Sequence, residues 1–121
     1  MVEHKSEYTH PQTFFVGIDG SEYAEAAFKI CKRGLFRESC DKLVLGHIRN
    51  KEKHYLAWNF KPEYIQEIYE TRLLDIGKKG EFAITDVFDD KPTKECLFNL
   101  AQERHATVIV TGMQGRKGIK E

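Results

Sequence analysis

A chain of 121 residues, 40% apolar and 31% charged, is long enough for one folded domain with a single core. Lysine plus arginine and aspartate plus glutamate number 19 each, so no net charge attracts the chain to nucleic acid or to an anionic membrane, and we expect neither as a partner. No stretch reaches the roughly 20 apolar residues of a membrane helix, and three scattered cysteines without a C-x-x-C pair favour reduced thiols in the cytoplasm.

The chain divides into a short polar beginning and one domain. Residues 1–12 contain no apolar segment of the kind that a secretory signal needs, and we interpret them as a flexible lead-in. The domain is expected to span residues 13–121, because no internal repeat or low-complexity linker interrupts it.

The first predicted strand and helix are joined by a tight turn. Residues 14–18 form a compact apolar run that stops at residues 19–21, Asp-Gly-Ser. Ser21 can cap a helix, because its hydroxyl can accept a hydrogen bond from the first helical turn. Apolar residues spaced three and four apart then give this helix one buried face: Ala24, Ala27, Phe28, Cys31 and Leu35.

The same alternation continues along the rest of the chain. An apolar run at 43–48 predicts the second strand, and Pro62 starts a second helix after a long irregular connection. The third strand, 82–88, is less continuously apolar, which favours a position near a sheet edge. A third helix begins near Pro92, and the run 107–111 predicts the fourth strand. The inner face of the second helix is expected to be Ile65, Ile68, Tyr69, Leu73 and Ile76, and Gly77 and Gly80 are expected to end this helix. The inner face of the third helix is expected to be Leu97, Leu100 and Ala101.

The order of these elements predicts the fold class. Near-continuous apolar strands that alternate with amphipathic helices indicate a parallel sheet covered on both faces. Right-handed crossovers then give a doubly wound, three-layer α/β/α sandwich of the Rossmann-like class. Ligands of such sheets bind beyond the carboxyl ends of the strands, where the strand order reverses. Binding chemistry is therefore expected in the segments that follow the strands.

The segment after the fourth strand has the composition of a phosphate-binding loop. Residues 112–118 are Gly-Met-Gln-Gly-Arg-Lys-Gly, and the three glycines let backbone N–H groups converge on an anion. Arg116 and Lys117 add positive charge. The alternative is a plain flexible turn, because a G-x-x-G-x-x-G run by itself is a weak motif.

The segment after the first strand offers a carboxylate. Asp19 can accept hydrogen bonds from an adenine amine or a ribose hydroxyl, and it can equally form a turn and helix cap with Ser21. The two segments would meet at one point of the sheet if the first and fourth strands are neighbours.

Other nucleotide-binding and catalytic motifs are absent from the sequence. It contains no G-x-x-x-x-G-K-[ST] loop, no G-x-G-x-x-G after the first strand, no G-x-S-x-G and no H-E-x-x-H. The pattern pairs neither His47 nor His105 with a nucleophile, so we interpret both as structural. We assign no catalytic residue and no metal ligand.

The arrangement resembles the universal stress protein family from Phe14 onward. The resemblance rests on residues 16–21 (Val-Gly-Ile-Asp-Gly-Ser), residues 43–48 (Leu-Val-Leu-Gly-His-Ile) and residues 106–118, where a strand is followed by G-x-x-G. This last segment is similar to the ATP-binding motif of the family, which continues with nine residues and then Gly-Ser or Gly-Thr.

The resemblance implies a five-stranded parallel sheet of the adenine nucleotide alpha hydrolase-like type, a bound ATP with or without magnesium, and a homodimer. In the ATP-binding branch the acid after the first strand contacts the adenosine, which implies Asp19 here, and a backbone contact to adenine falls on Ile48. Gly17 stands where many members have a proline. Ribose and phosphates would be held by the glycine loop: Gly112, Met113, Gln114, Gly115, Arg116, Lys117 and Gly118.

The chain departs from the family pattern after Gly115, because only six residues follow it. The second half of the motif and the last helix and strand of the family are absent from this sequence, which would leave the fourth strand as an exposed edge. The expected function is a regulatory module of the stress response that binds ATP. Two alternatives remain: a dimerising interaction module of the same fold that binds no nucleotide, and a slow ATP hydrolase.

Overall fold

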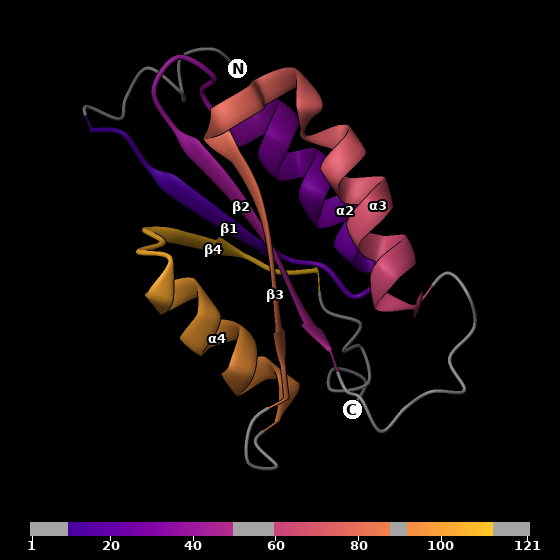
Figure 1. Cartoon of the computed structure of the whole chain (residues 1–121). Helices are drawn as coiled ribbons and strands as arrows, with labels where there is room; N and C mark the ends of the chain where they lie inside the picture. The colour runs from indigo at the N-terminus through magenta and orange to yellow at the C-terminus, as the bar shows by residue number, and fades with distance from the viewer. Residues whose placement is uncertain (1–9, 50–59, 88–91, 113–121) are drawn as a thin grey trace.

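The structure, a computed structural model, describes residues 10–49, 60–87 and 92–112. Its centre is a four-stranded parallel sheet with the strand order β3-β2-β1-β4 (Figure 1). The strands are β1 (Thr13–Gly17), β2 (Lys42–Arg49), β3 (Gly80–Asp86) and β4 (Val108–Val110).

Helices cover both faces of this sheet, as the sequence pattern predicts. They are α2 (Glu22–Ile30), which continues into a wider helical turn, η1 (Cys31–Leu35), then α3 (Pro62–Arg72) with a tight turn, η3 (Leu74–Lys79), and α4 (Thr93–Glu103). Figure 1 shows α2 and α3 together on one side of the sheet and α4 on the other. The expected three-layer α/β/α sandwich is therefore confirmed, and no helix in the described part is long and apolar enough to cross a membrane.

The core is split into two layers by the alternation of side chains along the strands. Phe14 and Val16 point to the face covered by α2 and α3, whereas Phe15, between them, points to the face covered by α4. Both layers need apolar residues at nearly every strand position, which explains why β1 and β2 are continuous apolar runs.

Local signals place the ends of the elements. The hydroxyl of Ser21 accepts a hydrogen bond from the N–H of Ala24 at 3.2 Å, which confirms the expected helix cap. The second helix is shorter than expected: α3 ends at Arg72, and Gly77 adopts a positive φ of 56° inside the following turn. A positive φ suits glycine because it lacks a Cβ, and this residue reverses the chain toward β3.

The order of the strands decides which of them are central. Within the described residues, β3 and β4 are the two outer strands, which confirms the edge position expected for the third strand. The pairing of Phe14 with Leu43 on one side and with Val108 on the other makes β1 a central strand. The first and fourth strands are thus neighbours.

A buried carboxylate ties together the amino ends of β1 and β2. The side chain of Asp41 is fully buried and accepts hydrogen bonds from the backbone N–H groups of Gln12, at 2.8 Å, and Arg37, at 2.9 Å. The guanidinium of Arg37 also donates to both carboxylate oxygens. Burial raises the pKa of Asp41, but the guanidinium and the two N–H groups lower it by more, so the net pKa lies below the usual range.

Candidate functional site

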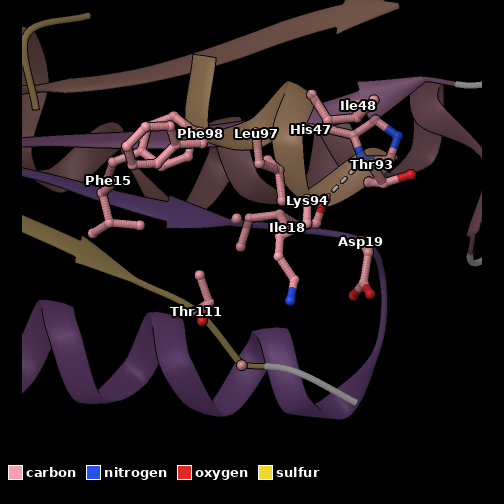
Figure 2. A pocket seen from close by; sticks show the side chains of 13 residues that line it. Phe15, Ile18, Asp19, His47, Ile48, Thr93, Lys94, Leu97, Phe98 and Thr111 are labelled. Carbon is pink, nitrogen blue, oxygen red and sulfur yellow. Dashed lines mark hydrogen bonds between the residues drawn. The ribbon is translucent and has the colours of Figure 1, made fainter. Parts of the chain in front are cut away.

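A cavity of about 290 Å³ opens at the carboxyl ends of the strands. The chain leaves β1 toward α2 on one face of the sheet and reaches β4 from α4 on the other, so the connections diverge between these two strands (Figure 1). Such a divergence leaves a crevice that no crossover fills. The cavity, shown in Figure 2, is lined by Phe15, Gly17, Ile18, Asp19, His47, Ile48, Thr93, Lys94, Leu97, Phe98, Ile109, Thr111 and Gly112.

Four of the residues singled out in the sequence line this one cavity. Gly17 and Asp19 come from the end of β1, Ile48 from the end of β2 and Gly112 from the segment after β4. The other six predicted residues lie outside the described part of the chain, and their positions stay predictions: Met113, Gln114, Gly115, Arg116, Lys117 and Gly118.

Gly112 is required by a close approach to α2. A Cβ atom at this position would lie 1.9 Å from the backbone oxygen of Tyr23, in the first turn of that helix. The absence of a side chain therefore brings the start of the glycine-rich segment against the same turn that follows Asp19. This is the kind of close backbone contact for which glycine is needed.

Asp19 makes the turn that one interpretation of the sequence predicts. Its Oδ1 atom accepts a hydrogen bond from the N–H of Ser21 at 2.9 Å, which is the geometry of a turn before a helix. Its Oδ2 atom has no hydrogen-bond partner among the described residues, and the side chain is exposed. The structural role consequently leaves one carboxylate oxygen available to a ligand.

Ile48 presents two backbone groups beside the cavity. The N–H of Lys42 donates to Gln12 and the C=O of Gly46 accepts from Ile18, so even-numbered residues of β2 face β1. The N–H and C=O of Ile48 face the same way, but β1 has already turned away at Asp19. In the described part of the chain no backbone group pairs with them. One donor and one acceptor, side by side, are thus available to a planar ligand that carries the complementary pair.

His47 holds the ends of β1 and β2 together. Its Nδ1 atom lies 2.7 Å from the carbonyl oxygen of Ile18, and since a carbonyl can only accept, Nδ1 carries the hydrogen. Burial lowers the pKa of this imidazole below its usual value, although the Ile18 hydrogen bond and the charge of Asp19 oppose the shift. The ring is neutral near pH 7 and links the ends of β1 and β2 through its hydrogen bond to Ile18, in line with its interpretation as structural.

One wall of the cavity, formed by α4, was not predicted from the sequence. Thr93, Lys94, Leu97 and Phe98 all lie in the first two turns of this helix and line the cavity. Gly17 leaves room for a side chain of this helix, because a Cβ there would lie 3.0 Å from Cδ1 of Leu97. A signal existed: every crossover helix of a parallel sheet begins at the carboxyl edge, where ligands bind.

Comparisons with known proteins bear on the fold. No family model and no curated protein sequence matches this chain. Among solved structures, it is similar to a protein from the universal stress protein family of Burkholderia pseudomallei, with 16% identity, 93% of this chain and 89% of the other covered, and a TM-score of 0.56. It is also similar to protein Rv1636 of Mycobacterium tuberculosis, with 21% identity, 87% and 73% covered, and a TM-score of 0.51. The chain therefore has the fold of a universal stress protein.

Proposed function

We propose that this protein is a regulatory module of the universal stress protein type that binds an adenine nucleotide, ATP in the first place, in the cavity between the ends of β1 and β4. The observation that carries the proposal is the convergence of Asp19, Ile48 and Gly112, from three separate strand ends, on one cavity. None of the three is close to another in the sequence.

The cavity has complementary chemistry for each part of an adenosine. Its lining is mostly apolar, which suits the flat faces of a purine, and the Ile48 backbone offers a donor and an acceptor to the purine edge. The unpaired Oδ2 atom of Asp19 can accept a hydrogen bond from a ribose hydroxyl. Gly112 marks the side of the cavity from which the phosphate-binding loop is expected to extend.

A magnesium ion would be coordinated by the phosphates of the nucleotide and not by a dedicated set of protein ligands. No group of three or more His, Cys, Asp or Glu residues in the described part could hold a metal ion. Magnesium is commonly bound through substrate phosphates and water with one or two carboxylates, so this finding is compatible with Mg-ATP. All three cysteines lie in the described part as thiols, which fits the cytoplasm that we propose as the compartment.

Titration calorimetry and thermal unfolding with ATP and magnesium test the proposal. At a ligand concentration of about 100 times Kd, binding should stabilise the fold by about 2.7 kcal/mol and raise the unfolding temperature. Asp19→Ala should remove most of this nucleotide-dependent rise. No heat of binding and no rise with adenosine, AMP or ATP would refute nucleotide binding.

A second variant separates recognition from folding. Asp19→Asn keeps an oxygen that can accept the Ser21 N–H, so the turn should survive, but it replaces the other oxygen by an NH2 group that cannot accept. We expect this variant to unfold like the parent without ligand and to bind nucleotide more weakly. Glu38→Ala, in the exposed turn before β2, is the charge-matched control and should bind as the parent does.

One observation favours a second candidate, a dimerising interaction module. Phe98 is 51% exposed and Ile109 is 41% exposed, both line the cavity, and β4 is an outer strand of the described sheet. Exposed apolar residues beside a strand edge are typical of surfaces that bind another protein. Calorimetry and sedimentation together separate the two candidates. An interaction module should give no heat with ATP and should sediment as a dimer that dissociates on Ile109→Lys, whereas a nucleotide-binding module gives heat with ATP whatever its oligomeric state.

A further inference from the structure

We infer that Lys94, on α4, binds the phosphate end of the ligand and makes the cavity select adenine nucleotides over the uncharged nucleoside. This inference rests on the proposed function and adds a residue of the α4 wall to it. It also assigns a polarity to the cavity, with an acidic side at Asp19 and a basic side at Lys94.

The position of Lys94 on its helix directs it into the cavity. Lys94, Leu97 and Phe98 are three and four residues apart, so they share one face of α4, and all three line the cavity. In Figure 2 the Lys94 side chain extends away from the helix, and its ammonium is drawn between the carboxylate of Asp19 and the side chain of Thr111. The apolar stem of the lysine covers the cavity wall, while its charged end projects beyond it.

No carboxylate in the described part of the chain neutralises the charge of Lys94. Lys94 forms no ion pair within the described residues, although Asp19 lines the same cavity. By contrast, the basic groups of Lys32, Arg49 and Arg72 are each within 4 Å of a carboxylate. An ammonium without a partner beside a ligand-sized cavity is suited to an anionic ligand.

No other described lining residue can supply this charge. His47 also lines the cavity, but its ring is buried and neutral. The amino end of α2 is a poor phosphate site, because Ser21 already caps it and the acidic Glu22 and Glu25 occupy its first turn. Lys94 is thus the one permanent cation among the lining residues that the structure describes.

These charges fix the direction in which a nucleotide would lie. Asp19 would repel a phosphate placed against it and favours the hydroxyl groups of a ribose instead. The phosphates are then directed to the side of Lys94, where Thr111 offers a hydroxyl donor and Gly112 begins the glycine-rich segment. The purine edge is left to the backbone of Ile48.

The test compares adenosine, AMP and ATP by titration calorimetry on the parent protein and on Lys94→Met, which keeps the apolar stem and removes the charge. We expect the parent to bind AMP up to about fivefold more tightly than adenosine, the upper end for an exposed charge pair. Lys94→Met should abolish most of this difference and leave the Kd of adenosine unchanged. Lys94→Arg should restore it in part.

A matched control and a salt series make the result specific. Lys42→Met removes an exposed lysine at the opposite end of β2 and should leave all three affinities as in the parent. Raising the salt from about 0.05 M to about 0.5 M should shrink the advantage of AMP over adenosine in the parent but not in Lys94→Met, because salt screens exposed charges.

The outcomes separate this inference from the proposed function. Adenosine and AMP of equal affinity in the parent, or an equal loss for both in Lys94→Met, would overturn the role of Lys94 while leaving nucleoside binding intact. If none of the three ligands binds the parent, the proposed function fails and the inference fails with it.

Discussion

Two carboxylates at opposite ends of the sheet differ in how far their side chains are exposed to solvent. Asp41 is fully buried and satisfied by Arg37 and two backbone N–H groups, whereas Asp19 is exposed and uses only one of its oxygens among the described residues. A buried charge with all of its partners is a structural group, because removing any of them leaves a charge without compensation. An exposed carboxylate with an unused oxygen can serve a ligand at little cost to folding.

At this scale we predict that Asp41→Asn lowers the free energy of unfolding by about 3 kcal/mol, because the Arg37 guanidinium loses its buried partner. Urea unfolding at pH 7 measures the loss. Asp75→Asn, which removes an exposed partner of Lys32, is the matched control and should cost less than about 1 kcal/mol. Equal losses in the two variants would contradict the structural role of Asp41.

The same residue predicts a dependence of stability on pH. The folded-state pKa of Asp41 is depressed, so its contribution is fully present above the unfolded-state pKa of about 3.9 and is lost as pH falls through the folded-state value. The difference in unfolding free energy between the parent and Asp41→Asn should therefore be constant from about pH 7 to about pH 5 and narrow in more acidic solution. A difference in unfolding free energy that grows on acidification would contradict a depressed pKa of Asp41 in the folded state.

At the scale of elements, the site depends on how closely the segment after β4 approaches α2. The contact between Gly112 and the Tyr23 carbonyl brings together two segments almost ninety positions apart, and it can form only because β1 and β4 are neighbours. On the α4 side the constraint is weaker, since a Cβ at Gly17 would meet only the end of the Leu97 side chain. Gly112 thus sets how near the segment after β4 comes to α2.

We predict that Gly112→Ala destabilises the protein by about 2 kcal/mol, because the added methyl group would overlap the Tyr23 backbone and force a shift. The urea midpoint should fall without a change in the m-value. Gly34→Ala is the control: no atom lies within 4 Å of the added methyl, so this variant should change stability by less than about 1 kcal/mol. Similar midpoints for both variants would refute the close approach.

At the scale of the whole molecule, stability should be highest at the centre of the sheet. β1 has a partner strand on each side and contributes to both core layers, whereas the described β4 is three residues long and pairs only with β1. Of the two neighbouring strands that flank the cavity, β1 is thus largely buried and β4 is partly exposed. An outer strand with few partners can open locally while the core stays closed.

We predict that hydrogen exchange follows this order. Hydrogen-bonded amides of β1 and β2 should exchange last, near the rate of global unfolding, and those of β4 should exchange earlier through local opening. Exchange measured residue by residue by NMR is the test. Protection of Val108–Val110 equal to that of β1 would contradict the order.

Local patterns in the sequence are enough to specify the elements, their order and the class of the fold. Apolar runs, helical spacing and the turn after β1 are local properties, and they predicted all four strands, the Ser21 cap and helices on both faces. The acid after the first strand and the glycine-rich segment indicated Asp19 and Gly112, and the family resemblance alone indicated Ile48. The end of α3 was misplaced, because the buried apolar spacing continues through Leu73 and Ile76 although the α-helix ends at Arg72 and tightens into η3.

That these residues share a cavity, and which other residues line it, follows from the folded arrangement and not from local patterns. Strand order, the backbone groups of Ile48 left beyond the end of β1, and the Lys94 side of α4 all depend on contacts between segments far apart in the chain. No spacing rule reports such contacts, because pairing and crossover geometry are settled by packing of the whole sheet against its helices. The sequence therefore supplied the chemical groups, and the fold arranged them around one crevice.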